Sequence, residues 1–79
     1  MFEERVLLGD GRRLECAFET PSRYVLRLLQ GPQARVEYFN DGKGHRLRTR
    51  GRESAYDFKS VEQLRYDFER DAEDAQRQG

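Results

Sequence analysis

Residues 2–58 fall into short segments in which apolar and polar side chains alternate, and turn signals rich in glycine or proline separate the segments. In the clearest segment, Leu14, Cys16 and Phe18 alternate with charged or small residues. Because successive side chains of a strand point to opposite faces, this period of two predicts strands with one buried face. The strongest turn signal is Asn-Asp-Gly-Lys-Gly at residues 40–44. Short turns between successive strands favour an antiparallel meander of about five strands.

A single helix is predicted after the strands. Ser60 can cap its first turn, and Gln63 completes the capping-box pattern three residues later. We expect the helix over about 61–76, followed by a frayed tail over 77–79. Apolar residues recur in it at spacings of three or four and form one narrow stripe. The stripe consists of Val61, Leu64, Phe68, Ala72 and Ala75.

The length of 79 residues allows one domain, residues 1–79, with its strands within 2–58. The composition is 38% charged and 35% hydrophobic, but the apolar residues fall in short periodic runs, and the chain contains four Tyr and five Phe. Disordered chains lack such runs and are poor in aromatic residues. We therefore expect an α+β fold: an antiparallel β-meander with the C-terminal helix packed on one sheet face.

Catalytic chemistry finds little support in the residues. His45 is the only histidine and has no suggestively placed serine or cysteine nucleophile. Cys16 is the only cysteine, which excludes an internal disulfide and a cysteine-built zinc site, and we expect it to pack as a small hydrophobe. Asp67, Asp71 and Asp74 share a helix face that could hold a divalent cation weakly, although solvation is the usual explanation for such a face. We expect a protein that is not an enzyme and has neither cofactor nor metal.

The net charge is zero, from 15 basic and 15 acidic residues. A general nucleic-acid coat or a polybasic membrane anchor normally shows a net positive field, so both classes are disfavoured. No apolar stretch approaches the ~18 residues of a membrane span. The first residues, Met1 to Glu4, lack the features of a secretory signal. We expect a cytoplasmic protein.

Charge is nevertheless segregated along the chain. The stretch from Lys43 to Arg52 has five cations and no anion, whereas residues 60–79 carry six acids and three bases. A strand would align Arg46, Arg48 and Arg50 on one face, where they could contact nucleic-acid phosphates. Two structural alternatives are that these arginines keep an edge strand soluble or that they pair with the acidic helix.

The four tyrosines exceed what so small a core needs. Tyr66 lies two positions from both Leu64 and Phe68, off the apolar stripe, so we expect it to be exposed. Exposed Tyr and Arg commonly anchor protein interfaces. The alternative is that the rings cover the sheet margin with their hydroxyls in water. The candidate partner-binding residues are Arg46, Arg48, Arg50, Arg52, Tyr38, Tyr56 and Tyr66.

The predicted helix entry, residues 57–64 followed by Phe68, resembles the strand-to-helix entry of small phage-encoded anti-CRISPR proteins that inhibit type I-F surveillance complexes. The resemblance implies a sheet-plus-helix plan and a non-catalytic protein that occupies a surface of the CRISPR effector complex. The matched residues are of structural types, so no binding residue is carried over. They are Asp57, Phe58, Ser60, Glu62, Gln63, Leu64 and Phe68.

The leading hypothesis is a small non-catalytic module that binds a protein partner, with a phage or mobile-element inhibitor such as an anti-CRISPR protein as its most specific form. One alternative is a nucleic-acid-contacting protein that uses the arginine-lined segment 43–52. Another is a bacterial domain of unknown function that forms a homodimer through an exposed edge strand.

Overall fold

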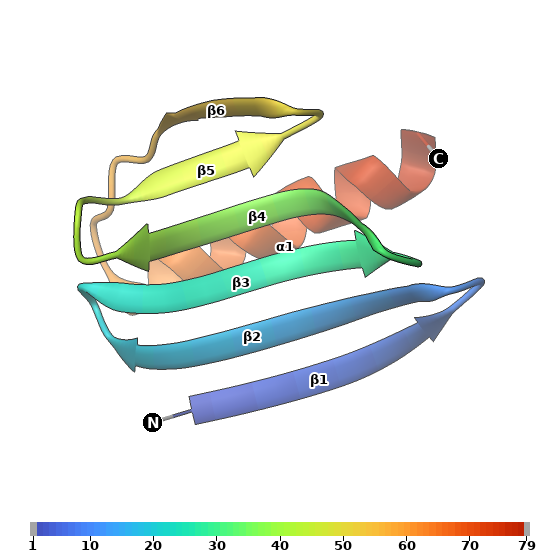
Figure 1. Ribbon diagram of the computed structural model, residues 1–79, viewed down its shortest axis with the longest axis horizontal. Coiled ribbons are helices and arrows are strands. Elements are labelled where there is room, and N and C mark those ends of the chain that lie inside the picture. Colours follow the sequence, from blue (N-terminus) through green and yellow to red (C-terminus); the bar gives the residue numbers. More distant parts are fainter. Residues whose placement is uncertain (1, 79) are drawn as a thin grey trace.

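The computed structural model describes residues 2–78 and shows a six-stranded antiparallel sheet followed by one helix (Figure 1). The strands are β1 (Phe2–Gly9), β2 (Arg12–Thr20), β3 (Arg23–Gln30), β4 (Gln33–Asp41), β5 (Arg46–Thr49) and β6 (Arg52–Ala55). Their spatial order is their order in sequence, so the predicted meander is confirmed, with six strands in place of about five. The helix α1 spans Val61–Gln78.

The predicted start of α1 is confirmed. Ser60 Oγ accepts a hydrogen bond from the Gln63 amide at 3.0 Å. The helix extends two residues beyond the predicted end at residue 76, to Gln78, while Gly79 lies outside the described residues. In the last turn, Arg77 donates to Glu73 at 2.6 Å. Such a pair four residues apart stabilises a helix end, and a cation there also complements the helix dipole.

The core lies between α1 and the central strands β3 and β4. Leu64, Phe68 and Ala72 of the predicted stripe are buried there. They pack on side chains of β3 and β4, namely Tyr24, Leu26, Leu28, Val36 and Tyr38. Val61, also predicted in the stripe, is instead 42% exposed and faces a groove toward β1 and β2. The buried part of the apolar stripe therefore begins at Leu64.

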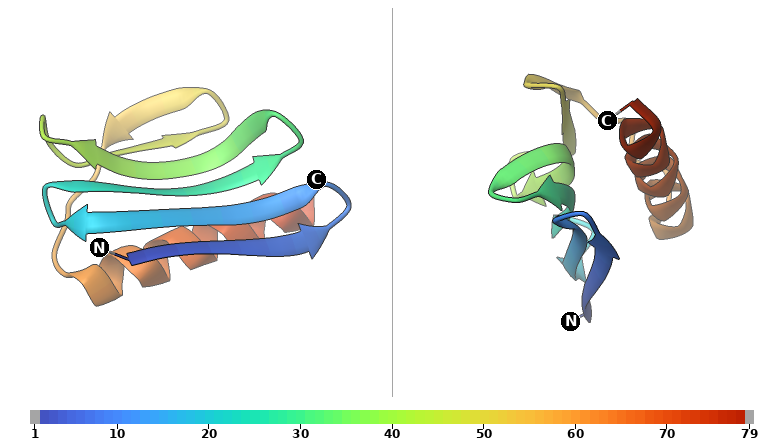
Figure 2. Two further views of the ribbon diagram at one scale, coloured as in Figure 1. Left: turned by 60° about the horizontal axis from the view of Figure 1, so that its bottom comes forward. Right: turned by 90° about the vertical axis from the view of Figure 1, so that its right-hand side faces the viewer.

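One helix cannot cover a sheet of this width. Adjacent strands lie about 4.8 Å apart and a helix with its side chains is about 10 Å across, so α1 covers two to three strands. The end-on view in Figure 2 shows α1 on one side of the sheet and no element on the other. Two surfaces consequently remain uncovered: the whole face opposite α1, and the margin over β1 and β2 on the helix side.

Candidate interaction surfaces

The face of the sheet opposite α1, called here the open sheet face, carries a row of alternating charges across all six strands. Each member lies directly opposite the next one in the strand register. The row, called here the charge ladder, reads from β1 to β6 as Arg5, Glu15, Arg27, Glu37, Arg48 and Glu53. Opposite charges directly across two strands stabilise a sheet, so this order favours the observed pairing.

The ladder is most closely paired on β4, β5 and β6. Arg48 donates from Nη1 to Glu37 at 3.2 Å and from Nη2 to Glu53 at 2.8 Å. The hydrogen bond from Arg48 lowers the pKa of Glu53, and the same bond raises the pKa of Arg48. Farther along, Arg27 Nε lies 3.6 Å from Glu37 Oε2, and Arg5 Nε lies 3.5 Å from Glu15 Oε2. The pairs toward β1 are thus looser than those toward β6.

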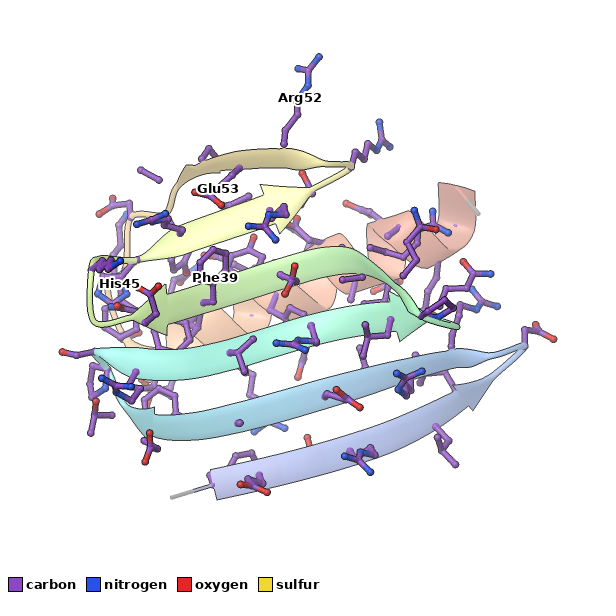
Figure 3. All side chains as sticks on the ribbon, in the orientation of Figure 1. Phe39, His45, Arg52 and Glu53 are labelled. Carbon is purple, nitrogen blue, oxygen red and sulfur yellow. The ribbon has the colours of Figure 1, made fainter. Side chains whose placement is uncertain are left out.

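The predicted row of three arginines is wrong at its third member. Arg46 and Arg48 lie on β5 and both hydrogen-bond Glu53, Arg46 at 2.9 Å. Arg50 lies in the turn after β5 with φ of 52°, because the strand ends at Thr49. Arg52 belongs to β6 and projects beyond the sheet edge (Figure 3).

Neither of the two structural alternatives, an edge strand or pairing with the acidic helix, describes Arg46 and Arg48. Arg46 and Arg48 pair with glutamates of the sheet, because the open sheet face points away from the acidic helix. Strand β5 lies between β4 and β6, so it is not an edge strand. Phe39 lies on the same face, and the Arg48 guanidinium is 5.5 Å from its ring centroid.

The three candidate tyrosines occupy three different environments. Tyr38 is 1% exposed and donates a hydrogen bond to Asp71, which makes it a core residue and corrects its assignment to a binding surface. Tyr56 is half-buried and donates to Asp67 Oδ2 at 2.7 Å. Burial raises the pKa of both hydroxyls, and the bonds to the carboxylates raise it further. Tyr66 is 62% exposed, as predicted.

These hydrogen bonds give two members of the acidic helix face a structural role. Asp67 and Asp71 accept the tyrosine hydroxyls, while the side chain of Asp74 is 56% exposed. Within residues 2–78, no cluster of three or more His, Cys, Asp or Glu side chains is arranged to hold a metal ion. No helix in this part of the chain is long and apolar enough to cross a membrane.

His45, the one histidine, holds the β4–β5 connection against the start of the helical segment. Its ring stacks on Phe58 with centroids 4.4 Å apart, and its Nδ1 lies 2.8 Å from the Tyr24 hydroxyl. Beside it, the buried Asn40 accepts the amide hydrogens of Gly42 and Gly44 and so closes the turn. These contacts give His45 a packing role.

Strand β1 forms a second candidate surface, which the sequence analysis missed. One edge of the sheet is β1, and all its residues are exposed. A groove with a cavity volume of ≈ 180 Å³ separates it from the start of α1, and we call it the β1 groove. The signal for it was the alternation of Phe2, Val6 and Leu8, but alternation does not reveal which part of a sheet the helix covers. The lining of the groove is mostly apolar and consists of Phe2, Cys16, Phe18, Leu26, Val61, Leu64 and Arg65.

Two of the residues that line the β1 groove, Arg65 and Cys16, are polar or titratable. Arg65 of α1 reaches across to β1, where it donates to Glu4 at 3.3 Å and lies 5.8 Å from the Phe2 ring centroid. On β2, Cys16 packs against the core as the sequence predicts. Its burial raises the pKa of the thiol, so at neutral pH the groove contains a protonated sulfur.

Comparisons of the chain with protein-family models, with curated proteins and with solved structures found no match. The function of the chain must therefore be inferred from these surfaces and from the residues that form them.

Proposed function

We propose that the chain is a non-catalytic protein-binding module whose partner binds along β1. The supporting observation is the concentration of exposed apolar side chains on this strand: Phe2 is 46% exposed, Val6 36%, Leu7 79% and Leu8 36%. They are four of the six large apolar side chains exposed among residues 2–78. An apolar edge strand is a liability unless something covers it, and such patches mark interaction sites.

The partner presents an extended segment that pairs with β1 as an additional strand. The outer edge of β1 offers the unpaired backbone N–H and C=O groups that this mode of binding uses. An apolar side chain of the segment enters the β1 groove between Phe2, Cys16 and Val61. The groove volume of ≈ 180 Å³ exceeds the ~150 Å³ of a cavity that holds a benzene ring, so a large side chain fits.

Binding to nucleic acid receives less support than binding to protein. The guanidinium groups of Arg46 and Arg48 are engaged by Glu37 and Glu53, so the open sheet face offers phosphates a neutral row instead of a positive one. The chain as a whole also has no net charge, since 15 acidic residues balance 15 basic ones. Measuring the binding of labelled DNA and RNA over a range of salt concentrations tests this alternative, since phosphate contacts make the affinity fall steeply with salt.

The most specific form of the proposal is an inhibitor of a type I CRISPR surveillance complex, acting in the cytoplasm of the host cell. Its support is the resemblance at residues 57–68. Ser60 caps the helix and Leu64 and Phe68 lie in the core, so these matched residues have structural roles, and the proposal assigns the contacts of such an inhibitor to β1. Expression in a host with an active type I-F system should restore plaque formation by a targeted phage. If the host still blocks the phage, the anti-CRISPR form of the proposal is excluded and the general proposal of a protein-binding module remains.

A charge placed on β1 tests the binding mode. Val6→Lys should abolish capture of the partner from the native host, because the ammonium cannot be buried beneath an added strand. The matched control is Ser54→Lys on β6, the opposite edge strand, which should leave capture intact. The bound partner should also slow alkylation of Cys16 in the β1 groove. Equal capture by wild type and Val6→Lys would refute the assignment to β1.

A further inference from the structure

We propose that two copies of this chain pack face to face through the open sheet face, independently of the partner bound along β1. The charge ladder alternates in sign through six strands, starting with Arg5 on β1 and ending with Glu53 on β6. An alternating row with an even number of members is complementary to its own reverse. The open sheet face is therefore complementary in charge to a second copy of itself.

The ladder distinguishes between the two ways of stacking the sheets about a two-fold axis that lies between them. An axis parallel to the strands reverses their order, so that β1 lies over β6, β2 over β5 and β3 over β4 of the second copy. Arg5 then faces Glu53, Glu15 faces Arg48, and Arg27 faces Glu37 of the other chain. An axis across the strands places each strand over its own copy and each charge over an identical one. Like charges in an interface are strongly disfavoured, so only the first arrangement is compatible.

The apolar residues beside the ladder fit the same arrangement. Val25 and Phe39 are register partners on β3 and β4. Exchanging β3 and β4 between the copies places Val25 over Phe39 of the other chain on one side of the ladder. The centre of the interface thus combines apolar contacts with unlike charges, as specific interfaces do.

The dimensions of the face are sufficient for a stable dimer. Viewed onto the sheet, the molecule measures 32 by 25 Å, an outline of roughly 800 Å² (Figure 1). A standard interface buries about 800 Å² on each partner. Stacked sheets lie about 10 Å apart with their strands nearly aligned. Arginine and glutamate side chains extending from both faces can meet across that distance.

The centre of the ladder has unused hydrogen-bonding capacity. Arg27 Nε is buried and has no acceptor among residues 2–78, since Glu37 at 3.6 Å is too distant for a hydrogen bond. The two-fold axis passes between Arg27 and Glu37, so a dimer contains this unlike pair twice. In the dimer, Glu37 of the second copy would place a second carboxylate over the Arg27 guanidinium, which has only a long ion pair within one chain.

Charge reversal at these two positions tests the proposal by sedimentation velocity. Wild type should form a dimer, and Arg27→Glu or Glu37→Arg alone should raise the dimer dissociation constant by about a hundredfold or more, because each places like charges face to face twice. An equimolar mixture of the two variants should dimerise again, since each chain then faces the opposite charge. Mixing cannot repair the ladder within either chain, so recovery reports contacts between chains only.

The controls separate this proposal from the one for β1. Val6→Lys should leave the dimer intact, and circular dichroism should show each variant folded. If reversal at the centre prevents folding, Arg5→Glu mixed with Glu53→Arg applies the same test at the more exposed ends of the ladder. A wild-type monomer at millimolar concentration, failure of the mixtures to recover, or dimer loss in Val6→Lys alone would each overturn the proposal.

Discussion

Replacement of Tyr38 by phenylalanine removes one oxygen atom from the core and leaves the ring in place. The ring is 1% exposed and meets Phe68 and Tyr56 edge-on, with centroids 6.0 and 4.9 Å away. Phenylalanine can keep all of these contacts. The change in the free energy of unfolding therefore measures the hydrogen bond that the hydroxyl donates to Asp71.

The expected loss follows from the surroundings of that carboxylate. A hydrogen bond to a charged group contributes about 1.5–3 kcal/mol. The side chain of Asp71 is 25% exposed and its Oδ1 lies 3.5 Å from Arg70 Nε, so water and Arg70 partly replace the lost donor. We therefore expect a loss at or just below the lower end of that range, about 1–1.5 kcal/mol. With a urea m-value of about 1 kcal/mol/M for so small a domain, the unfolding midpoint should fall by about 1–1.5 M.

Urea denaturation followed by far-ultraviolet circular dichroism measures this shift. Tyr66→Phe is the control, because its ring is 62% exposed and removal of a solvated hydroxyl should change the midpoint little. In a double-mutant cycle with Asp71→Asn, the coupling to Tyr38→Phe should account for most of the loss. An unchanged midpoint in Tyr38→Phe, or equal losses in both phenylalanine variants, would refute the structural role of the Tyr38 hydroxyl.

Three further perturbations probe the cap, a turn and the buried phenols. Ser60→Ala should lower the free energy of unfolding in urea by about 1 kcal/mol. A loss smaller than that caused by an alanine substitution of an exposed residue would contradict the capping role of Ser60. Arg50→Asn should raise the melting temperature, because Asn tolerates the positive φ at this turn position; lower stability would argue that Arg50 makes compensating contacts. Burial raises the pKa of Tyr24 to about 12, and the pKa values of Tyr38 and Tyr56 are also raised. The buried phenols contribute fully to the free energy of unfolding below pH 10, the pKa of an unfolded tyrosine. Above pH 10 this free energy falls by up to about 1.4 kcal/mol per pH unit for each tyrosine. A free energy of unfolding that stays constant well above pH 10 would contradict their burial.

The local features of the fold could be predicted because each depends on a few neighbouring residues. The alternation of Leu14, Cys16 and Phe18 correctly indicated their common face, and Ser60 with Gln63 correctly located the helix start. The arginine prediction failed because alternation was extended past Thr49 into a turn. Arg50-Gly51 adopts two positive φ angles, and glycine at the second position was the available sign of a two-residue hairpin turn.

The charge ladder could not be derived from the turns alone, because β-bulges shift the register of three strand pairs. The turn at residues 31–32 pairs Gln30 with Gln33, and this register alone would place Arg27 opposite Val36. A β-bulge shifts the register between Leu28 and Leu29 and so brings Glu37 opposite Arg27. The arginines of one strand, taken without the residues on the neighbouring strands, give no sign of the glutamates that pair with them. The position of α1 is different in kind. Nothing local indicates that it covers Tyr38 and leaves Phe2 exposed, because the relative packing of sheet and helix decides that.

The two uncovered surfaces have a joint consequence if both proposals hold. Rotation about an axis parallel to the strands places the β1 edges of the two copies at opposite ends of the dimer, where both remain free. A partner that presents two segments would then bind with avidity, whereas a single segment would not. Arg27→Glu should therefore weaken binding to a surface coated with the partner and leave the affinity for one soluble copy unchanged. Equal weakening in both formats would mean that the open sheet face contacts the partner itself.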